Sequence, residues 1–277
     1  MSTVERAGLH IRYHSAGEGH PVVLVMGAGS TGRSWELHQV PALVAAGYRV
    51  TVFDNRGTGD TADAGAFTID DLVDDTAAVV EAVAEGRPAL VAGTSLGARI
   101  AQELALACPD LLGGIALLAA HGRLDPVQRA LSRGEAELIR AGVELPPEYA
   151  AAVTALHNLS PATLADPRGA QDWLELFELY PPSRSAGALA QIALCEFADR
   201  VPAYRDITVP TLVVGFADDR MIPPFLSREV ADAVPGARYH VVPGCGHYGY
   251  LERPDLVNAL LLEFFDSLRP ALASRRG

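Results

Sequence analysis

The sequence predicts an α/β fold, in which a doubly wound, mostly parallel sheet carries a helical cap inserted between two of its strands. Three observations predict it. Short apolar runs of strand length recur along the 277 residues, segments with helical periodicity separate them, and residues 121–208 show helical periodicity without a good strand. Hydrophobic residues make up 49% of the chain and charged residues 20%, which excludes a wholly disordered protein.

Six apolar runs are expected to be strands. Each is too continuous for a strand with one solvated face, so we expect each to be buried on both faces, as in a parallel sheet. In chain order the runs are Val22–Met26, Arg49–Phe53, Ala89–Ala92, Ile115–Ala119, Thr211–Gly215 and Arg238–Val242.

Helical patterns lie between these runs, and the alternation of strand and helix predicts the doubly wound arrangement. The expected helices are Trp35–Ala46, Ile69–Ala84, Leu96–Ala107, Pro224–Ala233 and Pro254–Leu268.

The helical stretch 121–208 divides the chain into a core of residues 1–120 and 209–277 and an inserted cap. Its helical segments are separated by prolines. Ligands in open α/β sheets bind beyond the carboxyl ends of the strands, so an insertion that leaves from that edge is expected to roof the site. The alternative is that the insertion only adds packing bulk.

Charge and composition limit the partners and the chemistry. The 34 acidic residues outnumber the 22 basic ones, all of them arginine, and the net charge is −12. Without a basic block, nucleic acid and anionic membrane surfaces are not expected partners. Without lysine, Schiff-base chemistry on a lysine is impossible. The lysine-free, alanine-rich composition suggests a GC-rich bacterial genome, and a tailoring role in secondary metabolism is one interpretation.

The cysteines and the N-terminal segment suggest a location. Cys108, Cys195 and Cys245 are widely separated and form no CxxC pair, which fits a reducing compartment and predicts no metal site. The first residues lack the pattern of a signal peptide, and apolar stretches such as Gly114–Ala120 are too short to span a bilayer. We therefore expect a cytoplasmic protein with no membrane partner.

A candidate nucleophile lies between a predicted strand and a predicted helix. Residues 93–97 read Gly-Thr-Ser-Leu-Gly, a G-x-S-x-G pattern. Such a serine sits on a sharp turn that pushes its hydroxyl out over the sheet edge, and the flanking glycines let the strand and the helix crowd together. The alternative is that Ser95 only caps the helix.

A serine nucleophile needs a base, and the base needs a group that orients it. His247 lies in a glycine-rich loop after the predicted strand Arg238–Val242. Asp218 and Asp219 follow the predicted strand Thr211–Gly215. Successive residues leaving a strand point to different sides, so at most one of the two carboxylates is expected to reach His247 well.

A competing motif lies near the N-terminus. Residues 27–32 spell G-x-G-x-x-G after a predicted strand, and Asp54 ends the next strand, which together approximate a dinucleotide-binding fingerprint. A nicotinamide enzyme would leave the later motifs unexplained. We therefore favour the serine site and expect no organic cofactor.

Together these segments resemble the α/β-hydrolase family over nearly the whole chain. Five segments match the family in order. They are the strand and oxyanion loop at Val22–Gly29, a D-x-R-G-x-G-x-S-like turn at Asp54–Thr61, the nucleophile elbow at Gly93–Gly97, the acid loop at Asp219–Pro223, and the histidine loop at Gly246-His247 with Glu252-Arg253-Pro254.

The resemblance implies a role for each residue. Ser95, Asp219 and His247 form the catalytic triad, with Asp219 preferred because the acid of the family stands four residues before a proline. The backbone amides of Ala28 and Leu96 form the oxyanion hole. Asp54 becomes a structural turn residue. The family commonly has His-Gly where this chain has Met26-Gly27, which leaves open what orders the oxyanion loop.

The resemblance also implies hydrolysis of a carboxylic ester, lactone or thioester of a small molecule through an acyl-enzyme on Ser95, without metal or cofactor. Two alternatives stay open. One is a non-hydrolytic enzyme of the same fold, such as a cofactor-free, haloperoxidase-like perhydrolase, a carbon–carbon bond hydrolase or a cyclase. The other is a hydrolase-like ligand-binding protein in which turnover is incidental.

Substrate-pocket candidates come from the end of one strand and from the insertion. His121 directly follows the predicted strand Ile115–Ala119, so it either faces the pocket or lies at the surface. The aromatic residues of the insertion either line an apolar pocket or form the core of the roof. The aromatic pocket candidates are Trp173, Phe177 and Phe197.

Overall fold

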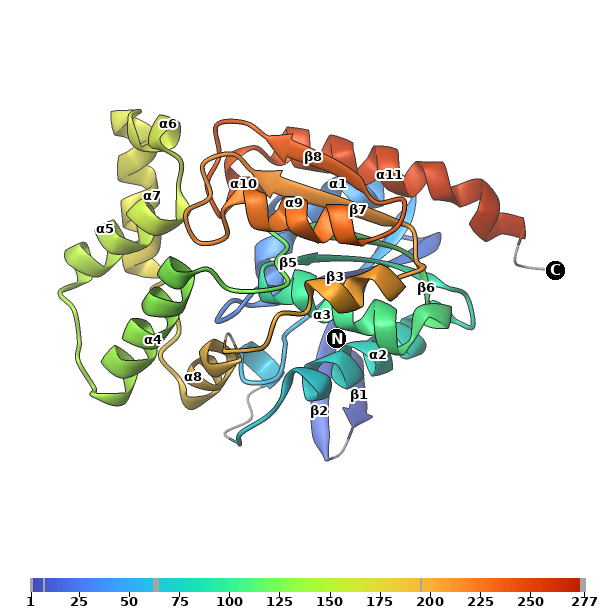
Figure 1. Ribbon diagram of the computed structural model, residues 1–277, viewed down its shortest axis with the longest axis horizontal. Coiled ribbons are helices and arrows are strands. Elements are labelled where there is room, and N and C mark those ends of the chain that lie inside the picture. The colour runs from blue at the N-terminus through green and yellow to red at the C-terminus, as the bar shows by residue number, and fades with distance from the viewer. Residues whose placement is uncertain (1, 7, 62–64, 195, 275–277) are drawn as a thin grey trace.

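The computed structural model describes residues 2–6, 8–61, 65–194 and 196–274, so Cys195 lies outside the described residues. Figure 1 shows a twisted sheet with helices on both faces and a group of helices, α4 to α8, gathered at one end. The predicted fold class is confirmed.

The described strands form one eight-stranded sheet in the order β1-β2-β4-β3-β5-β6-β7-β8. From β4 to β8 all neighbours are parallel, while β1 and β2 pair in an antiparallel manner with each other and with β4. All six predicted strands are present. The bounds are β1 Ser2–Arg6, β2 Leu9–Ala16, β3 His20–Val25, β4 Tyr48–Phe53, β5 Ala89–Thr94, β6 Leu112–Leu118, β7 Thr211–Phe216 and β8 Arg238–Val242.

Two features of the sheet differ from the prediction, and both concern its edges. Strands β1 and β2 were not predicted, because β2 buries only Ile11 fully and alternates with exposed residues such as Arg12 instead of forming a continuous apolar run. Strand β8 was expected to be buried on both faces, which is wrong. It is an edge strand, and Arg238, His240 and Val241 are exposed.

The helices of the core follow the predicted pattern closely. Helices α2, α3 and α9 begin and end at the predicted residues. Among the described helices, none is long and apolar enough to cross a bilayer. The bounds in the core are α1 Gln39–Ala45, α2 Ile69–Ala84, α3 Leu96–Ala107, α9 Pro224–Ala233, α10 Gly249–Glu252 and α11 Pro254–Ser274.

Prolines explain two differences in helix length. The predicted helix 35–46 is divided into a 3-10 helix and α1, because the ring of Pro41 would clash with the carbonyl of Leu37 in a continuous helix. Helix α11 instead runs past Pro270. The carbonyl that Pro270 leaves unpaired belongs to exposed Asp266, where water can bind it, and Leu272 beyond the proline is buried against the core.

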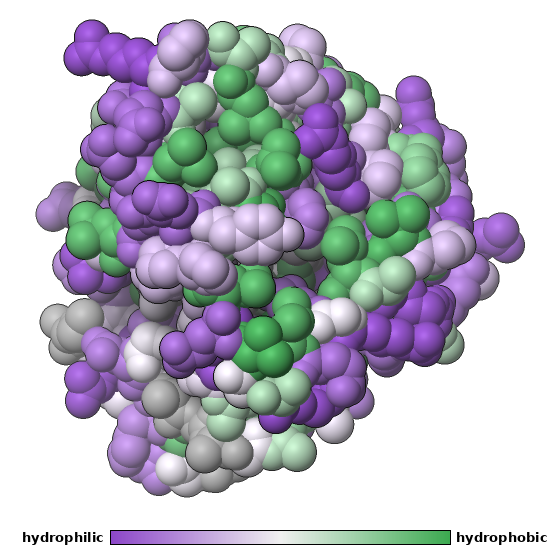
Figure 2. All heavy atoms as spheres, turned by 90° about the vertical axis from the view of Figure 1, so that its left-hand side faces the viewer, coloured by the Kyte–Doolittle hydropathy of each residue, from purple (hydrophilic) through white to green (hydrophobic). Residues whose placement is uncertain are grey.

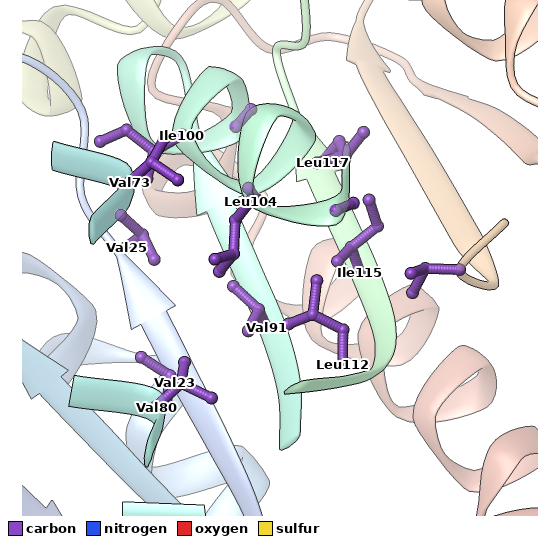
Figure 3. Packing of buried hydrophobic residues seen from close by; sticks show 14 of the residues in the cluster. Val23, Val25, Val73, Val80, Val91, Ile100, Leu104, Leu112, Ile115 and Leu117 are labelled. Atoms are coloured by element: carbon purple, nitrogen blue, oxygen red, sulfur yellow. The ribbon is translucent and has the colours of Figure 1, made fainter. Parts of the chain in front are cut away.

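Apolar side chains fill both faces of the sheet. On one face, Val80 of α2 and Ile100 and Leu104 of α3 pack on residues of β3, β5 and β6, including Val91 (Figure 3). On the other face, the 3-10 helix η1 (Gly32–Leu37) and the helices α1, α10 and α11 cover the same strands, with fully buried Phe265 among the largest side chains. The continuous apolar strands therefore lie between two helical layers, as the sequence predicted.

The inserted helices α4 to α8, called the cap from here on, lie between β6 and β7 in the chain. Each of α4 to α7 begins with proline at its first position, where the missing N–H costs no helical hydrogen bond. Tyr204, near the end of the insertion, is fully buried and packs in the core of the sheet. The bounds are α4 Pro126–Arg140, α5 Pro147–Asn158, α6 Pro161–Leu164, α7 Pro167–Leu179 and α8 Ala186–Ala193.

Candidate active site

Ser95 lies on the tight turn between β5 and α3. Its backbone has φ 55° and ψ −116°, a left-handed conformation that non-glycine residues rarely adopt. A Cβ on Gly93 would collide with the carbonyl of Gly97, and a Cβ on Gly97 would collide with the carbonyl of Val25. The two glycines therefore permit the close approach that gives the turn its shape.

The loop that follows β3 runs directly beside Ser95. A Cβ built on Gly27 would lie 3.4 Å from the Cβ of Ser95. Gly27, the residue before Ala28, is therefore adjacent to the nucleophile. Leu96 is the first residue of α3, so its N–H has no partner within the helix and lies at the positive end of the helix dipole. The two amides that the sequence predicts for an oxyanion hole thus belong to the residue that follows Ser95 and to the residue that follows Gly27.

Three hydrogen bonds to residues outside this loop order it without the histidine that is common in the family. The Asn55 amide donates to the carbonyl of Met26 at 2.8 Å. The Gly32 N–H donates to Asp54 at 2.8 Å, and the Gly29 N–H donates to Oε1 of Gln191 in α8 at 2.7 Å. Gln191, a cap residue, was not predicted from the sequence. These contacts answer what orders the loop when Met26 replaces histidine.

Asp54 is fully occupied in shaping the backbone. One carboxylate oxygen accepts the N–H of Gly32, and the other accepts the N–H of Asp60 at 2.9 Å. In a dinucleotide site this carboxylate would bind a ribose and Gly32 would open an α-helix. Gly32 instead begins a six-residue 3-10 helix. The geometry therefore argues against the nicotinamide alternative.

Asp219 and His247 meet beyond the carboxyl ends of β7 and β8. The Nδ1 of His247 lies 2.8 Å from Oδ2 of Asp219, whose side chain is completely buried. The other oxygen, Oδ1, accepts the backbone N–H groups of Met221 and Ile222 at 2.8 and 2.7 Å. Asp218 donates its backbone N–H to the carbonyl of Cys245. The backbone thus fixes the Asp219 carboxylate so that it faces the imidazole.

Glu252 joins the histidine loop to the cap, a contact that the sequence did not reveal. Its Oε2 accepts the N–H of Gly246 at 2.6 Å. Its Oε1 accepts the N–H of Ser160 at 2.9 Å and the hydroxyl of Thr163 at 2.6 Å. Glu252 is buried, so its charge is stabilised by these donors. The residue before His247 is therefore held by a side chain that also holds α6.

His121 and Phe197, two of the pocket candidates, lie together. His121 is only 5% exposed, so the surface alternative is wrong. The two rings are 5.7 Å apart, and the guanidinium of Arg99, on the nucleophile helix, stacks 3.5 Å from the centre of the Phe197 ring. Burial lowers the pKa of His121 to about 3, and the positive charge of Arg99 adds to the effect. His121 is therefore a neutral imidazole at neutral pH.

Trp173 and Phe177, the other two candidates, pack together in the small core of the cap, with ring centres 5.4 Å apart. Phe177 also reaches Tyr248, whose ring centre is 6.1 Å from that of His247. Burial raises the pKa of Tyr248 to about 12, which keeps its hydroxyl protonated. Tyr248 thus connects the aromatic core of the cap to the histidine and was not singled out in the sequence.

Near the site, the structure offers neither a second reactive nucleophile at Cys245 nor a metal-binding cluster among the described residues. Cys245, two residues before His247, is fully buried, and burial raises its pKa to about 12, so its thiol does not compete with Ser95 as a nucleophile. Among the described residues, no group of three or more His, Cys, Asp or Glu side chains is arranged to hold a metal ion. Tyr149 and Tyr180, on the cap, are exposed. The face of the molecule drawn in Figure 2 carries apolar side chains among hydrophilic ones.

Comparison with known proteins decides the family. A model described as "Alpha/beta hydrolase family" matches residues 22–260. The chain belongs to the α/β-hydrolase family. Among the relatives of this α/β-hydrolase is a Mycobacterium tuberculosis protein named "Putative non-heme bromoperoxidase BpoC", which is 46% identical over 261 residues, covering 94% of this chain and 99% of that protein. Its crystal structure has a TM-score of 0.90 to this α/β-hydrolase, covering 93% of this chain and 96% of that one.

Two further relatives carry other names. A protein of Variovorax paradoxus named "Putative carbamate hydrolase RutD" is 30% identical and covers 92% of this chain, with 95% of that protein matched. The crystal structure of an enol-lactonase from Burkholderia xenovorans is 25% identical with a TM-score of 0.82, covering 96% of this chain and all of that one (100%). The names describe different reactions, so the comparisons establish an enzyme of the α/β-hydrolase superfamily and not the bond on which it acts.

Proposed function

We propose that this α/β-hydrolase cleaves a carboxylic ester, lactone or thioester of a small molecule through an acyl-enzyme on Ser95. The observation that carries the proposal is the convergence of two features at one edge of the sheet. Ser95 sits on a strained turn beside two candidate oxyanion amides, and His247 is oriented by a buried carboxylate. This combination is the machinery that acyl transfer requires.

In the proposed mechanism, His247 removes the hydroxyl proton as Ser95 attacks the carbonyl carbon. The amides of Ala28 and Leu96 stabilise the negative charge that develops on the carbonyl oxygen. The leaving alcohol or thiol takes the proton from His247, and the acyl group stays on Ser95. Water, activated by the same imidazole, then hydrolyses the acyl-enzyme. Asp219 keeps the Nδ1 proton in place and stabilises the imidazolium.

Labelling and turnover test this proposal together. Wild-type protein should react covalently with a fluorophosphonate probe at Ser95 and should hydrolyse at least one member of a panel of p-nitrophenyl esters, lactones and thioesters. The Ser95→Ala variant should do neither and should keep the circular dichroism spectrum of the wild type. A wild-type protein that binds panel members without turnover and resists the probe would support the ligand-binding alternative instead.

A second candidate is perhydrolysis, which the name of the relative with 46% identity favours. The same acyl-enzyme would be intercepted by hydrogen peroxide instead of water, releasing a peracid. A peracid oxidises bromide to hypobromous acid and is itself reduced to the carboxylic acid, so bromination would need no heme. This reaction uses the same Ser95, His247 and Asp219.

Competition between the two nucleophiles separates these reactions. We would measure hydrolysis of a preferred ester with and without hydrogen peroxide, and detect peracid by bromination of monochlorodimedone in the presence of bromide. Peracid formation that exceeds hydrolysis at millimolar peroxide supports a perhydrolase. Hydrolysis that is unchanged by peroxide, without bromination, supports the hydrolase.

A further inference from the structure

Gln191 is a completely buried polar side chain of the cap whose two amide atoms both bind the core. Its Oε1 accepts the N–H of Gly29 at 2.7 Å, and its Nε2 donates to the carbonyl of Arg56 at 2.7 Å. The first bond spans 162 positions of the sequence and the second 135. One side chain of α8 therefore joins the oxyanion loop to the turn that follows β4.

A second, independent contact seats α8 against the same turn. The backbones of Gly57 and Gly187 touch, because a Cβ on Gly57 would lie 2.9 Å from the Cα of Gly187, and a Cβ on Gly187 would collide with the carbonyl of Gly57. Gly57 also has a φ of 88°, which favours glycine. Without side chains at these two positions, α8 approaches closely enough for Gln191 to reach Gly29.

The two bonds to the oxyanion loop act on either side of one peptide group. Asn55 binds the carbonyl of Met26 and so fixes the peptide plane between Met26 and Gly27. Gln191 binds the N–H of Gly29 and so fixes the plane between Ala28 and Gly29. The N–H of Ala28 belongs to the single peptide plane between these two. Within the loop, the Ser30 N–H donates to the carbonyl of Gly27 at 3.4 Å, in the same peptide group as the Ala28 N–H. The direction of the Ala28 amide is therefore set by this local bond together with one bond from the core and one bond from the cap.

We infer that Gln191 is a positioning residue that sets the Ala28 amide of the oxyanion hole, so that the hole is complete only while α8 is docked. This inference rests on the proposed function. Stabilisation of an oxyanion depends on the direction of the donor, which must be held before the reaction begins. The cap therefore contributes to the chemical step, in addition to the cover over the site that the sequence predicts.

Three variants test the inference. Gln191→Met keeps approximate size and removes both hydrogen bonds. Gly187→Ala keeps Gln191 but pushes α8 away from Gly57. The matched control is Ser185→Ala, because the hydroxyl of Ser185 caps the same helix by accepting the N–H of Ala188 at 3.0 Å and does not contact the oxyanion loop. Ser185→Ala weakens α8 without altering its bond to Gly29.

The readout is chosen to separate positioning from general destabilisation. For Gln191→Met we expect kcat on a preferred ester to fall about 10- to 100-fold with little change in KM. Affinity for a trifluoromethyl ketone, which forms an oxyanion on the enzyme, should fall by a similar factor. Gly187→Ala should show the same pattern, and Ser185→Ala should leave kcat and inhibitor affinity near wild type. Melting temperatures are recorded for every variant.

Either of two outcomes overturns the inference. Wild-type kcat and ketone affinity in Gln191→Met would show that the bond to Gly29 does not set the hole. Equal losses in Gln191→Met and Ser185→Ala would show a merely structural role. If Gln191→Met does not fold, Gly187→Ala decides by the same criteria. If the wild-type enzyme neither turns over an ester nor reacts with a fluorophosphonate, the proposed function itself is contradicted. The inference about Gln191 is then contradicted as well, because it rests on that function.

Discussion

His247 and Asp219 are 28 positions apart in the chain, yet their side chains meet at 2.8 Å, beyond the ends of the neighbouring parallel strands β7 and β8. Two backbone N–H groups hold the carboxylate from its other oxygen. Asp219 can therefore orient the imidazole without turning itself. Among the residues that the structure describes, no backbone N–H group donates a hydrogen bond to the carboxylate of the adjacent Asp218, which is half-buried.

This difference predicts unequal effects of two neighbouring substitutions. Asp219→Asn should lower kcat by several orders of magnitude, up to about ten-thousand-fold, because the amide no longer fixes the imidazole tautomer. Asp218→Asn should cost about tenfold or less, since it acts only through the electric field. Values of kcat and KM for both variants on one ester decide the matter. A larger loss in Asp218→Asn would contradict the assignment.

Glu252 is expected to stabilise the fold and the site together. Glu252→Gln places an amide where three donors converge, so at least one N–H or hydroxyl loses its acceptor. The free energy of unfolding should fall by about 2 kcal/mol, and kcat should fall because Gly246 precedes His247. Urea denaturation and ester kinetics measure the two effects.

Asp255→Asn is the matched control for Glu252→Gln. Asp255 lies three residues after Glu252 in the chain and is exposed. The substitution Asp255→Asn removes one negative charge, as Glu252→Gln does. Loss of this carboxylate charge should change the free energy of unfolding by only about a few tenths of a kcal/mol, because the charge interacts with the dipole of α11. Equal effects of the two variants would show that the loss of charge matters, and not the bond between cap and histidine loop.

Burial of His121 predicts a pH-dependent stability. Its pKa is lowered to about 3 in the folded protein, so the unfolded chain binds a proton at this position below about pH 6.5 and the folded protein does not. Stability contributed by the neutral ring is therefore present above pH 6.5 and is lost as the pH falls toward 3. His121→Gln should remove this slope. Between pH 7.5 and pH 5, the wild type should lose about 2 kcal/mol more than the variant in urea titrations. Parallel losses would contradict this account.

The fold was largely predictable because its core uses local patterns. A strand between two helical layers is a continuous apolar run, and helices α2 and α3 carry clear apolar stripes. The apolar pattern that predicts a strand is lost where the strand is only partly buried. Strand β2 alternates buried and exposed residues over a short length, and exposed β8 was recognised as a strand but not as an edge.

The residues of the candidate site also differ in how far the sequence alone predicts them. Ser95 and His247 stand in glycine-rich loops after strands, and the sequence alone nominated both. Gln191 lies in a segment with no distinctive composition, and Glu252 lies in the segment that resembles the family's histidine loop, but their partners Gly29 and Ser160 are 162 and 92 positions away. A hydrogen bond between such distant residues leaves no periodicity or spacing in the sequence. These contacts form only where the folded chain brings the cap against the core.

The left-handed backbone of Ser95 implies a trade-off between stability and activity. A non-glycine residue in such a conformation carries about 1–3 kcal/mol of strain, whereas the extra freedom of glycine in the unfolded chain costs about 1 kcal/mol. Ser95→Gly should therefore melt at or above the temperature of the wild type although it is inactive, and Ser95→Ala, which keeps the strain, should melt at a lower temperature than Ser95→Gly. Differential scanning calorimetry of the three proteins measures this order. At position 95, serine is then the residue that the proposed catalysis requires, whereas glycine is the residue that gives the more stable fold.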